Sequence, residues 1–395
     1  MGGGTKIDFS IPNDRVGKPG RPNTDSAGLQ QNPEISGNGR KRMRNWMLNA
    51  FLCIGSSFLI LILLEGGTRV YDGEYSTKNF LAEERTLFTA GFPCHHDEYL
   101  GWVPQKGYSG KKNYWGTEVT IKEYGIRSNG KEEMPVSSST PPILTVGDSF
   151  TFGDYVSNHE SWPAILERLL GQKVINAGVF GYGIDQSYLR AEQLIEVFEP
   201  KMVIFGFHPN DIDRCELSER TAVEKPFFDI VNDRLVLRNI PVPRPSQKKV
   251  IGPVRHLLGY SYFVHRMMMS RFRGYWLEGK NWLSNNKVHS DGEKVACLLF
   301  QKLEEVARAH SIKEIYVLVQ YTADPTPEEF RRVDNVLSGI GSLSLQVIDL
   351  RYELSKIRMA DEAKYAGLFA GHMTGEGNYF VARELEKAIK GSALQ

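Results

Sequence analysis

The stretch ILTVGDSFTFG, residues 143–153, decides the fold of this 395-residue chain. Ile143 to Val146 form a nearly unbroken apolar run, and a glycine, an aspartate and Ser149 follow it directly. Such a run is typical of a parallel β-strand that helices cover on both faces. Because parallel α/β sheets bind ligands beyond the carboxyl ends of their strands, Ser149 stands where a functional site is expected.

The same pattern recurs beyond this stretch, where short apolar runs alternate with amphipathic segments. The further runs span residues 173–178, 201–207, 314–321 and 345–350. Between two of them, segment 293–308 carries apolar residues at helical spacing and charged residues on its other side. This alternation predicts an α/β fold over residues 143–395, a three-layer α/β/α sandwich with a five-stranded parallel sheet of flavodoxin-like type.

Polar and glycine-rich motifs follow three of these other runs. NAGVFGYG (176–183) ends the second run, HPND (208–211) follows the third, and GHMTGEGN (371–378) comes after the fifth. The carboxyl ends of parallel strands meet at one edge of a sheet, so we expect these motifs to lie near Ser149.

These motifs contain what acyl transfer by a serine requires. Ser149 is a weak nucleophile until a base takes its proton, and His372 is the candidate base. The oxyanion of the tetrahedral intermediate needs donors, for which the N–H groups of Ser149 and Gly181 and the side-chain amide of Asn210 are candidates. Taken singly, each residue also has an explanation without chemistry: a helix cap, a surface histidine, or a turn.

Taken together and in this order, the motifs resemble those of the SGNH/GDSL hydrolase superfamily, in particular its single-pass, membrane-anchored bacterial members. GDSFTFG (147–153) resembles the block that carries the nucleophile, and Gly181, Asn210 and His372 fall on the residues of the other three blocks. LGW (100–102) and YGIRS further along also resemble the segment that precedes the hydrolase domain in such proteins. The resemblance implies a serine hydrolase that uses no metal or organic cofactor.

The sequence departs from the family at the acidic member of the catalytic triad. Phe369 and Ala370 occupy the positions just before His372 where the resemblance implies an aspartate. We therefore predict a Ser149–His372 dyad, with the histidine Nδ1–H donating to a backbone carbonyl in residues 366–371. The competing hypothesis is a carboxylate recruited from Asp349, Asp361, Glu362 or Glu376.

The N-terminal part of the chain predicts a membrane anchor. Residues 46–64 are nineteen uncharged residues, enough for a helix of about 28 Å, close to the thickness of a bilayer core. A basic cluster at 40–44 precedes them, so the positive-inside rule places the N-terminus in the cytoplasm and the hydrolase domain in the periplasm or outside the cell. A cleaved signal peptide and a buried core helix are the alternatives to this plasma (inner) membrane helix.

These features divide the chain into four parts. We predict a disordered cytoplasmic tail (1–44), a transmembrane helix (45–66), a membrane-proximal region with a Pro-rich linker (67–142) and the hydrolase-like domain (143–395). The insertion 213–290 is apolar with interspersed basic residues, and it either packs on the domain or lies on the membrane surface.

The amino-acid composition argues against two features, nucleic-acid binding and a disulfide framework. Lys and Arg total 48 against 47 acidic residues, and a net charge of +1 argues against a nucleic-acid binder. Four scattered cysteines are too few for a disulfide framework.

The sequence thus predicts a membrane-anchored serine esterase, deacylase or O-acyltransferase. An O-acetylated cell-surface glycan is a plausible ester substrate from the resemblance and the location alone. The alternative is a catalytically silent protein of the same fold that binds glycan or scaffolds the assembly of envelope polysaccharide. The sequence names no protein partner.

Overall fold

A computed structural model describes the chain at residues 35–75, 77, 79–81, 88, 91–135, 140–221, 223–244, 252–276, 288 and 291–392. The chain divides into two compact units, residues 1–67 and 68–395. Most of the predicted disordered tail, residues 1–34, lies outside the described residues.

The second unit is built on the predicted five-stranded parallel sheet. Its order is β13-β12-β7-β5-β6, and each neighbouring pair is parallel. All five predicted strands are confirmed to within two residues at each end: β5 (Ile143–Val146), β6 (Val174–Asn176), β7 (Met202–Phe207), β12 (Glu314–Val319) and β13 (Gln346–Asp349). The first strand in sequence, β5, lies between β7 and β6, so the motifs after these three strands are neighbours at one edge.

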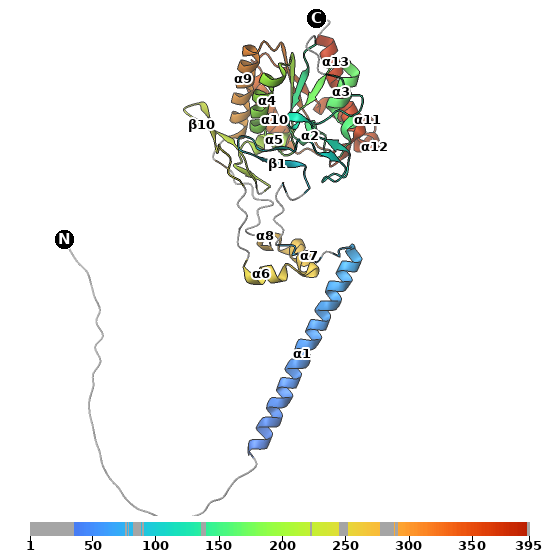
Figure 1. The fold of residues 1–395 in the computed structure, drawn as a ribbon, viewed down its shortest axis with the longest axis vertical. Coiled ribbons are helices and arrows are strands. Elements are labelled where there is room, and N and C mark those ends of the chain that lie inside the picture. The colour runs from blue at the N-terminus through green and yellow to red at the C-terminus, as the bar shows by residue number, and fades with distance from the viewer. Residues whose placement is uncertain are drawn as a thin grey trace, which may run out of the picture. The chain divides into compact units, whose positions relative to one another are not determined.

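Helices cover both faces of this sheet, which completes the predicted three layers (Figure 1). One group contains α4 (Ile184–Phe198), α5 (Pro209–Arg214), α9 (Gly292–Ala309) and α10 (Pro327–Ile340), which pack on one another. The other includes α3 (Trp162–Leu170) and α13 (Gly375–Ser392), which pack together. Shorter helices complete the unit: α2 (Ser149–Phe152), α11 (Arg351–Ala360) and α12 (Glu362–Gly367).

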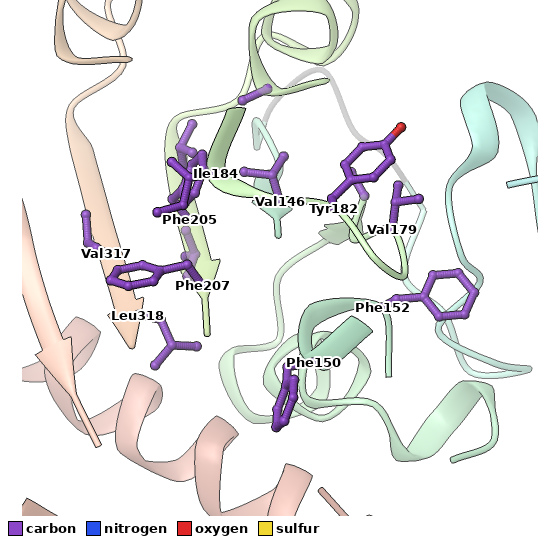
Figure 2. Packing of buried hydrophobic residues seen from close by; sticks show 14 of the residues in the cluster. Val146, Phe150, Phe152, Val179, Tyr182, Ile184, Phe205, Phe207, Val317 and Leu318 are labelled. Atoms are coloured by element: carbon purple, nitrogen blue, oxygen red, sulfur yellow. The ribbon is translucent and has the colours of Figure 1, made fainter. Parts of the chain in front are cut away.

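The core lies between the sheet and these helices. Figure 2 shows Phe205 and Phe207 of β7 close to Val317 and Leu318 of β12, and all four side chains are at most 1% exposed. Strands buried on both faces need such continuous apolar runs, which is why the sequence pattern located them.

The predicted membrane-proximal region packs into this same core. It contains β1 (Cys94–Asp97), β2 (Gly101–Pro104), β3 (Ser109–Gly110) and β4 (Val119–Thr120), all in antiparallel pairs. Arg127 is buried, its backbone N–H donates to Asn176 at the end of β6, and its guanidinium donates to the carbonyl of Phe152 (2.8 Å). The YGIRS motif therefore holds the loop after Ser149 in place.

The insertion contains two kinds of structure. Its hairpins β8 (Glu219–Arg220) with β9 (Val223–Glu224), and β10 (Phe227–Val231) with β11 (Arg234–Arg238), contribute Val223 and Phe228 to the core. Its helices α6 (Pro253–Leu258) and α7 (Tyr262–Arg271) contact Asp72, Asn79 and Phe80 instead, and α8 (Arg273–Trp276) packs against α7.

The N-terminal helix α1 spans Ile35–Asp72. It begins inside the predicted tail, so residues 35–44 are helical rather than disordered, because the basic residues of this stretch are good helix formers and continue the apolar helix. Among the described residues, one helix passes the length and hydropathy test for crossing a membrane, at Lys41–Asp72.

Candidate active site

Ser149 is the first residue of α2, directly after β5. The side chain of Asp148 accepts a hydrogen bond from the N–H of Phe150 (2.9 Å) and caps this helix, so the cap is Asp148 and not the serine. Gly147 makes the preceding turn with φ 151°, and a Cβ there would lie 2.4 Å from the carbonyl oxygen of Gly206. This turn leaves Ser149 only 6% exposed at the carboxyl edge of the sheet.

His372 lies beside the serine. It belongs to β15 (His372–Met373), which pairs with β14 (Phe369–Ala370) around Gly371 at φ 80°. Its Nε2 is 2.9 Å from the Oγ of Ser149, although 223 residues separate the two in sequence. The ring centroids of Phe150 and Tyr155 lie 4.8 and 5.3 Å from the centroid of the imidazole. The structure thus brings the two predicted dyad residues into hydrogen-bond contact.

Asn378 fixes the hairpin that carries His372, and sequence reasoning missed it. Its side-chain oxygen accepts from the N–H of Trp162 in α3 (2.9 Å), and its Nδ2 donates to the carbonyl of Met373 (3.0 Å). Because Asn378 is 1% exposed, this bridge is a buried one. Its place six residues after the histidine, at the end of the GEGN motif, was the available signal.

The other ring nitrogen of His372, Nδ1, lacks the backbone carbonyl partner that the sequence predicted. Nδ1 is buried and makes no hydrogen bond with any residue that the structure describes, so the predicted carbonyl partner in residues 366–371 is absent there. The histidine lies in a short hairpin, where Ala370 pairs with His372 across Gly371, and its ring is held by Nε2 against Ser149 instead.

The four carboxylates that were predicted as substitutes for the missing acid do not hydrogen-bond to Nδ1 of this ring in the described part of the chain. Asp349 pairs with Arg351 (3.2 Å), and Asp361 caps α12 through the N–H of Lys364 (2.9 Å). Glu362 pairs with Arg358, while Glu376 lies in the first turn of α13.

Asp154 is the carboxyl group that sequence reasoning missed. Its Oδ2 lies 3.9 Å from Nε2 of His372, the same nitrogen that contacts Ser149, and the residue is buried. Burial and the nearby Asp148 carboxylate raise the pKa of Asp154 well above its usual range, although Arg127 opposes this. A protonated Asp154 on the Nε2 side cannot orient Nδ1. Its position, five residues after the serine in GDSFTFGD, was a visible signal.

A buried ionic network braces the other side of Ser149. Nη1 of Arg214 donates to Oδ2 of Asp148 (3.0 Å), to the carbonyl of Tyr182 (2.7 Å) and to the carboxylate of Asp211. Burial is the largest single influence and by itself would raise the pKa of Asp148, but Arg214, His208 and the N–H of Phe150 together hold that pKa below its usual range. Oδ2 of the ionised Asp148 also lies 3.2 Å from Oγ of Ser149, so it and Nε2 of His372, at 2.9 Å, are alternative acceptors for the single hydroxyl proton.

Burial also determines the charge of the histidines. It lowers the pKa of His372 below 6.5, with Arg214 acting in the same direction and Asp148 against it. Burial lowers the pKa of His208, which stacks on Phe150 at 4.9 Å, to about 4. Both rings are therefore neutral at pH 7, the form in which a histidine can accept a proton.

The two further candidate donors follow the strands on either side of β5. Gly181 has φ 78°, in the loop after β6, and a Cβ there would lie 3.3 Å from Nε of Arg220. Asn210 is exposed in the first turn of α5, after β7, and its backbone N–H donates to Nδ1 of His208 (3.2 Å). The strand order places both loops beside the loop of Ser149, as the motif order predicted.

The fold and this site define a class: a three-layer α/β protein with a serine–histidine pair at the carboxyl edge of its parallel sheet. Comparison with known proteins gives two results. No family model matches the chain, and no curated protein matches it.

Several solved structures do match the chain. A structure described as a lipolytic protein of the G-D-S-L family, from Desulfitobacterium hafniense DCB-2, is 14% identical with a TM-score of 0.36, over 63% of this chain and 99% of that one. An acetylxylan esterase from Geobacillus stearothermophilus is 13% identical with a TM-score of 0.37, over 65% and 96%. The esterase EstA from Pseudoalteromonas sp. is 11% identical with a TM-score of 0.36, over 65% and 100%. This chain is similar to these proteins over 63–65% of its length.

Proposed function

We propose that this protein is a membrane-anchored serine hydrolase that cleaves esters, with Ser149 as nucleophile and His372 as general base. The observation that carries the proposal is the 2.9 Å distance between Nε2 of His372 and Oγ of Ser149. A base must lie within about 2.6–3.2 Å of the proton that it abstracts, and this pair meets that condition. The lowered pKa of His372 supplies the neutral base at pH 7.

The proposed reaction has two steps. Nε2 of His372 takes the hydroxyl proton while Oγ of Ser149 attacks the ester carbonyl, and the resulting oxyanion is bound by the N–H groups of Ser149 and Gly181 and by the amide of Asn210. The intermediate collapses, the histidine returns the proton to the leaving alcohol, and an acyl-serine remains. Water then repeats the sequence and releases the acid; a sugar hydroxyl in place of water would make the enzyme an O-acyltransferase.

The surroundings of His372 predict a slow enzyme. During catalysis the imidazole becomes an imidazolium, which a carboxylate on Nδ1 normally stabilises. Here Nδ1 has no such partner among the described residues, and the nearest ionised carboxylate, Asp148, acts through space from the side of Ser149. We therefore keep the proposed dyad, with Asp148 supplying part of the missing electrostatic stabilisation.

The proposal also includes the membrane in which the enzyme lies and the side of it that carries the hydrolase unit. The apolar run of α1 and the basic cluster before it favour a single-pass plasma membrane protein with a cytoplasmic N-terminus and a periplasmic or extracellular hydrolase unit. An enzyme held there would reach esters on exported or surface glycans, such as O-acetyl groups.

The test is covalent labelling of the full chain in detergent with a fluorophosphonate probe. We expect the wild-type protein to be labelled, and Ser149→Ala and His372→Gln to be unlabelled while remaining folded by circular dichroism. A wild-type protein that is folded and unlabelled would overturn the proposal and favour the catalytically silent, glycan-binding alternative.

A further inference from the structure

The helices α6, α7 and α8 of the insertion are unusual in charge. Residues 253–276 contain four arginines and two histidines, and they contain no aspartate or glutamate. The whole chain, by contrast, is balanced at 48 basic and 47 acidic residues. We call this segment the helical module. Its charge fits an anionic partner.

The module is attached to the chain immediately after the apolar run. The carboxylate of Asp72, at the end of α1, accepts from the hydroxyl of Tyr262 (2.9 Å) and pairs with Arg266 (3.0 Å). The N–H of Phe80 donates to the carbonyl of Gly259 (2.8 Å), and its ring stacks on His265 with centroids 4.9 Å apart. These contacts tie α7 to the last turn of α1 and to Phe80.

Gly259 shows how close this packing is. A Cβ at this position would lie 2.2 Å from the side-chain oxygen of Asn79 and 3.1 Å from the Cβ of Leu81. A larger residue would therefore push α6 away from residues 79–81. Trp276 and Leu81, both at most 1% exposed, show that the module has a small interior of its own.

One face of the module is apolar and uncovered. Val254, Leu257 and Leu258 are spaced i, i+3 and i+4 along α6, so they share one side of the helix, and they are 69%, 71% and 40% exposed. Phe272 and Tyr275 are exposed as well. Single exposed apolar side chains need no explanation, but a helical face of three beside unbalanced positive charge is typical of an element that lies in a membrane interface.

The module is attached to the chain close to the apolar run in sequence. The run ends at Leu64, and Asp72, which contacts α7, follows it by eight residues. If the run spans the membrane, the module is therefore tethered by a short segment to the edge of the hydrocarbon core and can reach the headgroup layer.

We propose that the helical module is a membrane-surface element that binds anionic phospholipid. The face of Val254, Leu257 and Leu258 enters the boundary between headgroups and acyl chains, while the arginines of the module attract lipid phosphates. This inference rests on the proposed anchoring by α1 and is independent of the ester hydrolysis. It gives the hydrolase unit a second attachment to the bilayer besides its transmembrane helix.

The experiment places a fluorophore on the apolar face of the full-length protein. In a background with Cys53→Ser and Cys297→Ser, where Cys94 and Cys215 are buried, Leu257→Cys is labelled with an NBD dye. The matched control is Val347→Cys in β13, which is 43% exposed. Both proteins are reconstituted into vesicles of phosphatidylcholine, alone or mixed with phosphatidylglycerol.

We expect the dye at 257 to shift its emission to shorter wavelength and to lose intensity when spin-labelled lipid is included, with a larger effect in the anionic vesicles. The dye at 347 should emit as in water in both. Arg271→Glu should reduce the extra effect of phosphatidylglycerol, whereas Arg308→Glu on α9, also exposed, should not. These variants lie outside the Ser149 site, so fluorophosphonate labelling reports the hydrolase separately.

Two results would overturn the proposal in different ways. A chain that does not float with vesicles would show that α1 is not an anchor, and both the location and this inference would fall. A chain that floats while the dye at 257 behaves like the dye at 347 would overturn the membrane-surface role alone.

Discussion

The two sides of Ser149 are built differently. On one side Asp148 is held by the N–H of Phe150 and by Arg214, which itself binds Asp211. On the other side His372 contacts the serine through Nε2, and its Nδ1 has no hydrogen-bond partner among the described residues. The nucleophile is thus braced by a buried ionic network, whereas the base is placed by ring packing and by the Asn378 bridge to its hairpin. This site therefore positions its serine and its histidine but supports charge on the histidine only weakly.

The largest expected effect comes from removing the hydroxyl of Ser149, which both sides of the site contact. Ser149→Ala deletes only a hydroxyl, so the fold should be retained while ester hydrolysis falls by about 10⁴-fold or more. Turnover of a chromogenic ester by the purified protein measures this. Hydrolysis at the wild-type rate in this variant would mean that the chemistry lies elsewhere.

The variant Arg214→Gln tests the ionic network on the Asp148 side of Ser149. The buried, ionised carboxylate of Asp148 would lose its cation, and unfolding should become easier by about 3–5 kcal/mol, since an unpaired buried charge is costly. The control Arg331→Gln removes an arginine that is 54% exposed, and it should cost less than about 1 kcal/mol. Chemical denaturation of both variants checks the difference, and equal costs would contradict the bracing role.

The oxyanion donors are tested by Asn210→Ala. Loss of its side-chain amide should reduce kcat by about 10²–10³-fold, because the donor acts on charge that develops only in the transition state. KM should change little. A rise in KM at constant kcat would instead assign Asn210 to ground-state binding of the substrate.

The variant Ala370→Asp tests whether a carboxylate partner for Nδ1 of His372 increases activity. Ala370 is exposed and lies directly opposite His372 in the β14–β15 pair, so side chains at the two positions point to the same face with Cβ atoms about 4.5–5.5 Å apart. A carboxylate there can accept from Nδ1–H, and we expect kcat to rise by up to about tenfold. Ala370→Asn is the uncharged control, and an equal gain from it would rule out stabilisation of the imidazolium.

The smallest expected effect is a shift in the pH dependence of kcat/KM. Only neutral His372 can accept the serine proton, so activity is lost as the pH falls through the pKa of this residue. Because burial lowers that pKa below 6.5, the acidic limb of kcat/KM should have its midpoint below pH 6.5, and activity at mildly acidic pH should exceed that expected of an ordinary histidine by a few fold. A midpoint at or above 6.5 would show that the buried setting of His372 does not hold in solution.

Much of the fold followed from local patterns. Four of the five sheet strands are short apolar runs buried on both faces, and the edge strand β13 is an apolar run that is partly exposed. Helix α9 buries Val295, Leu299 and Leu303 from one side, so hydrophobic periodicity alone located these elements. The start of α1 was missed, because the basic residues before the apolar run look like a tail by composition yet favour a helix by propensity.

The same distinction applies to the residues of the site: local motifs identified some of them, and the others act through contacts between distant segments. Ser149, Gly181, Asn210 and His372 could be named because each follows a recognisable strand in a motif, whereas Asp154, Arg214 and Asn378 could not be assigned partners. Arg214 meets Asp148 across 66 residues, and Asn378 meets Trp162 across 216. Nothing in a local pattern specifies such pairs.

Local sequence alone therefore specified the five strands of the parallel sheet, helix α9, the apolar segment of α1 and the identity of the candidate nucleophile and base, since these depend on short-range periodicity and residue chemistry. Only the tertiary structure decided that Nε2 of His372 meets Ser149, that its Nδ1 meets no partner among the described residues, and that α7 packs on the end of α1. The physical reason is that contacts between distant segments depend on strand order and close packing, which are properties of the whole chain.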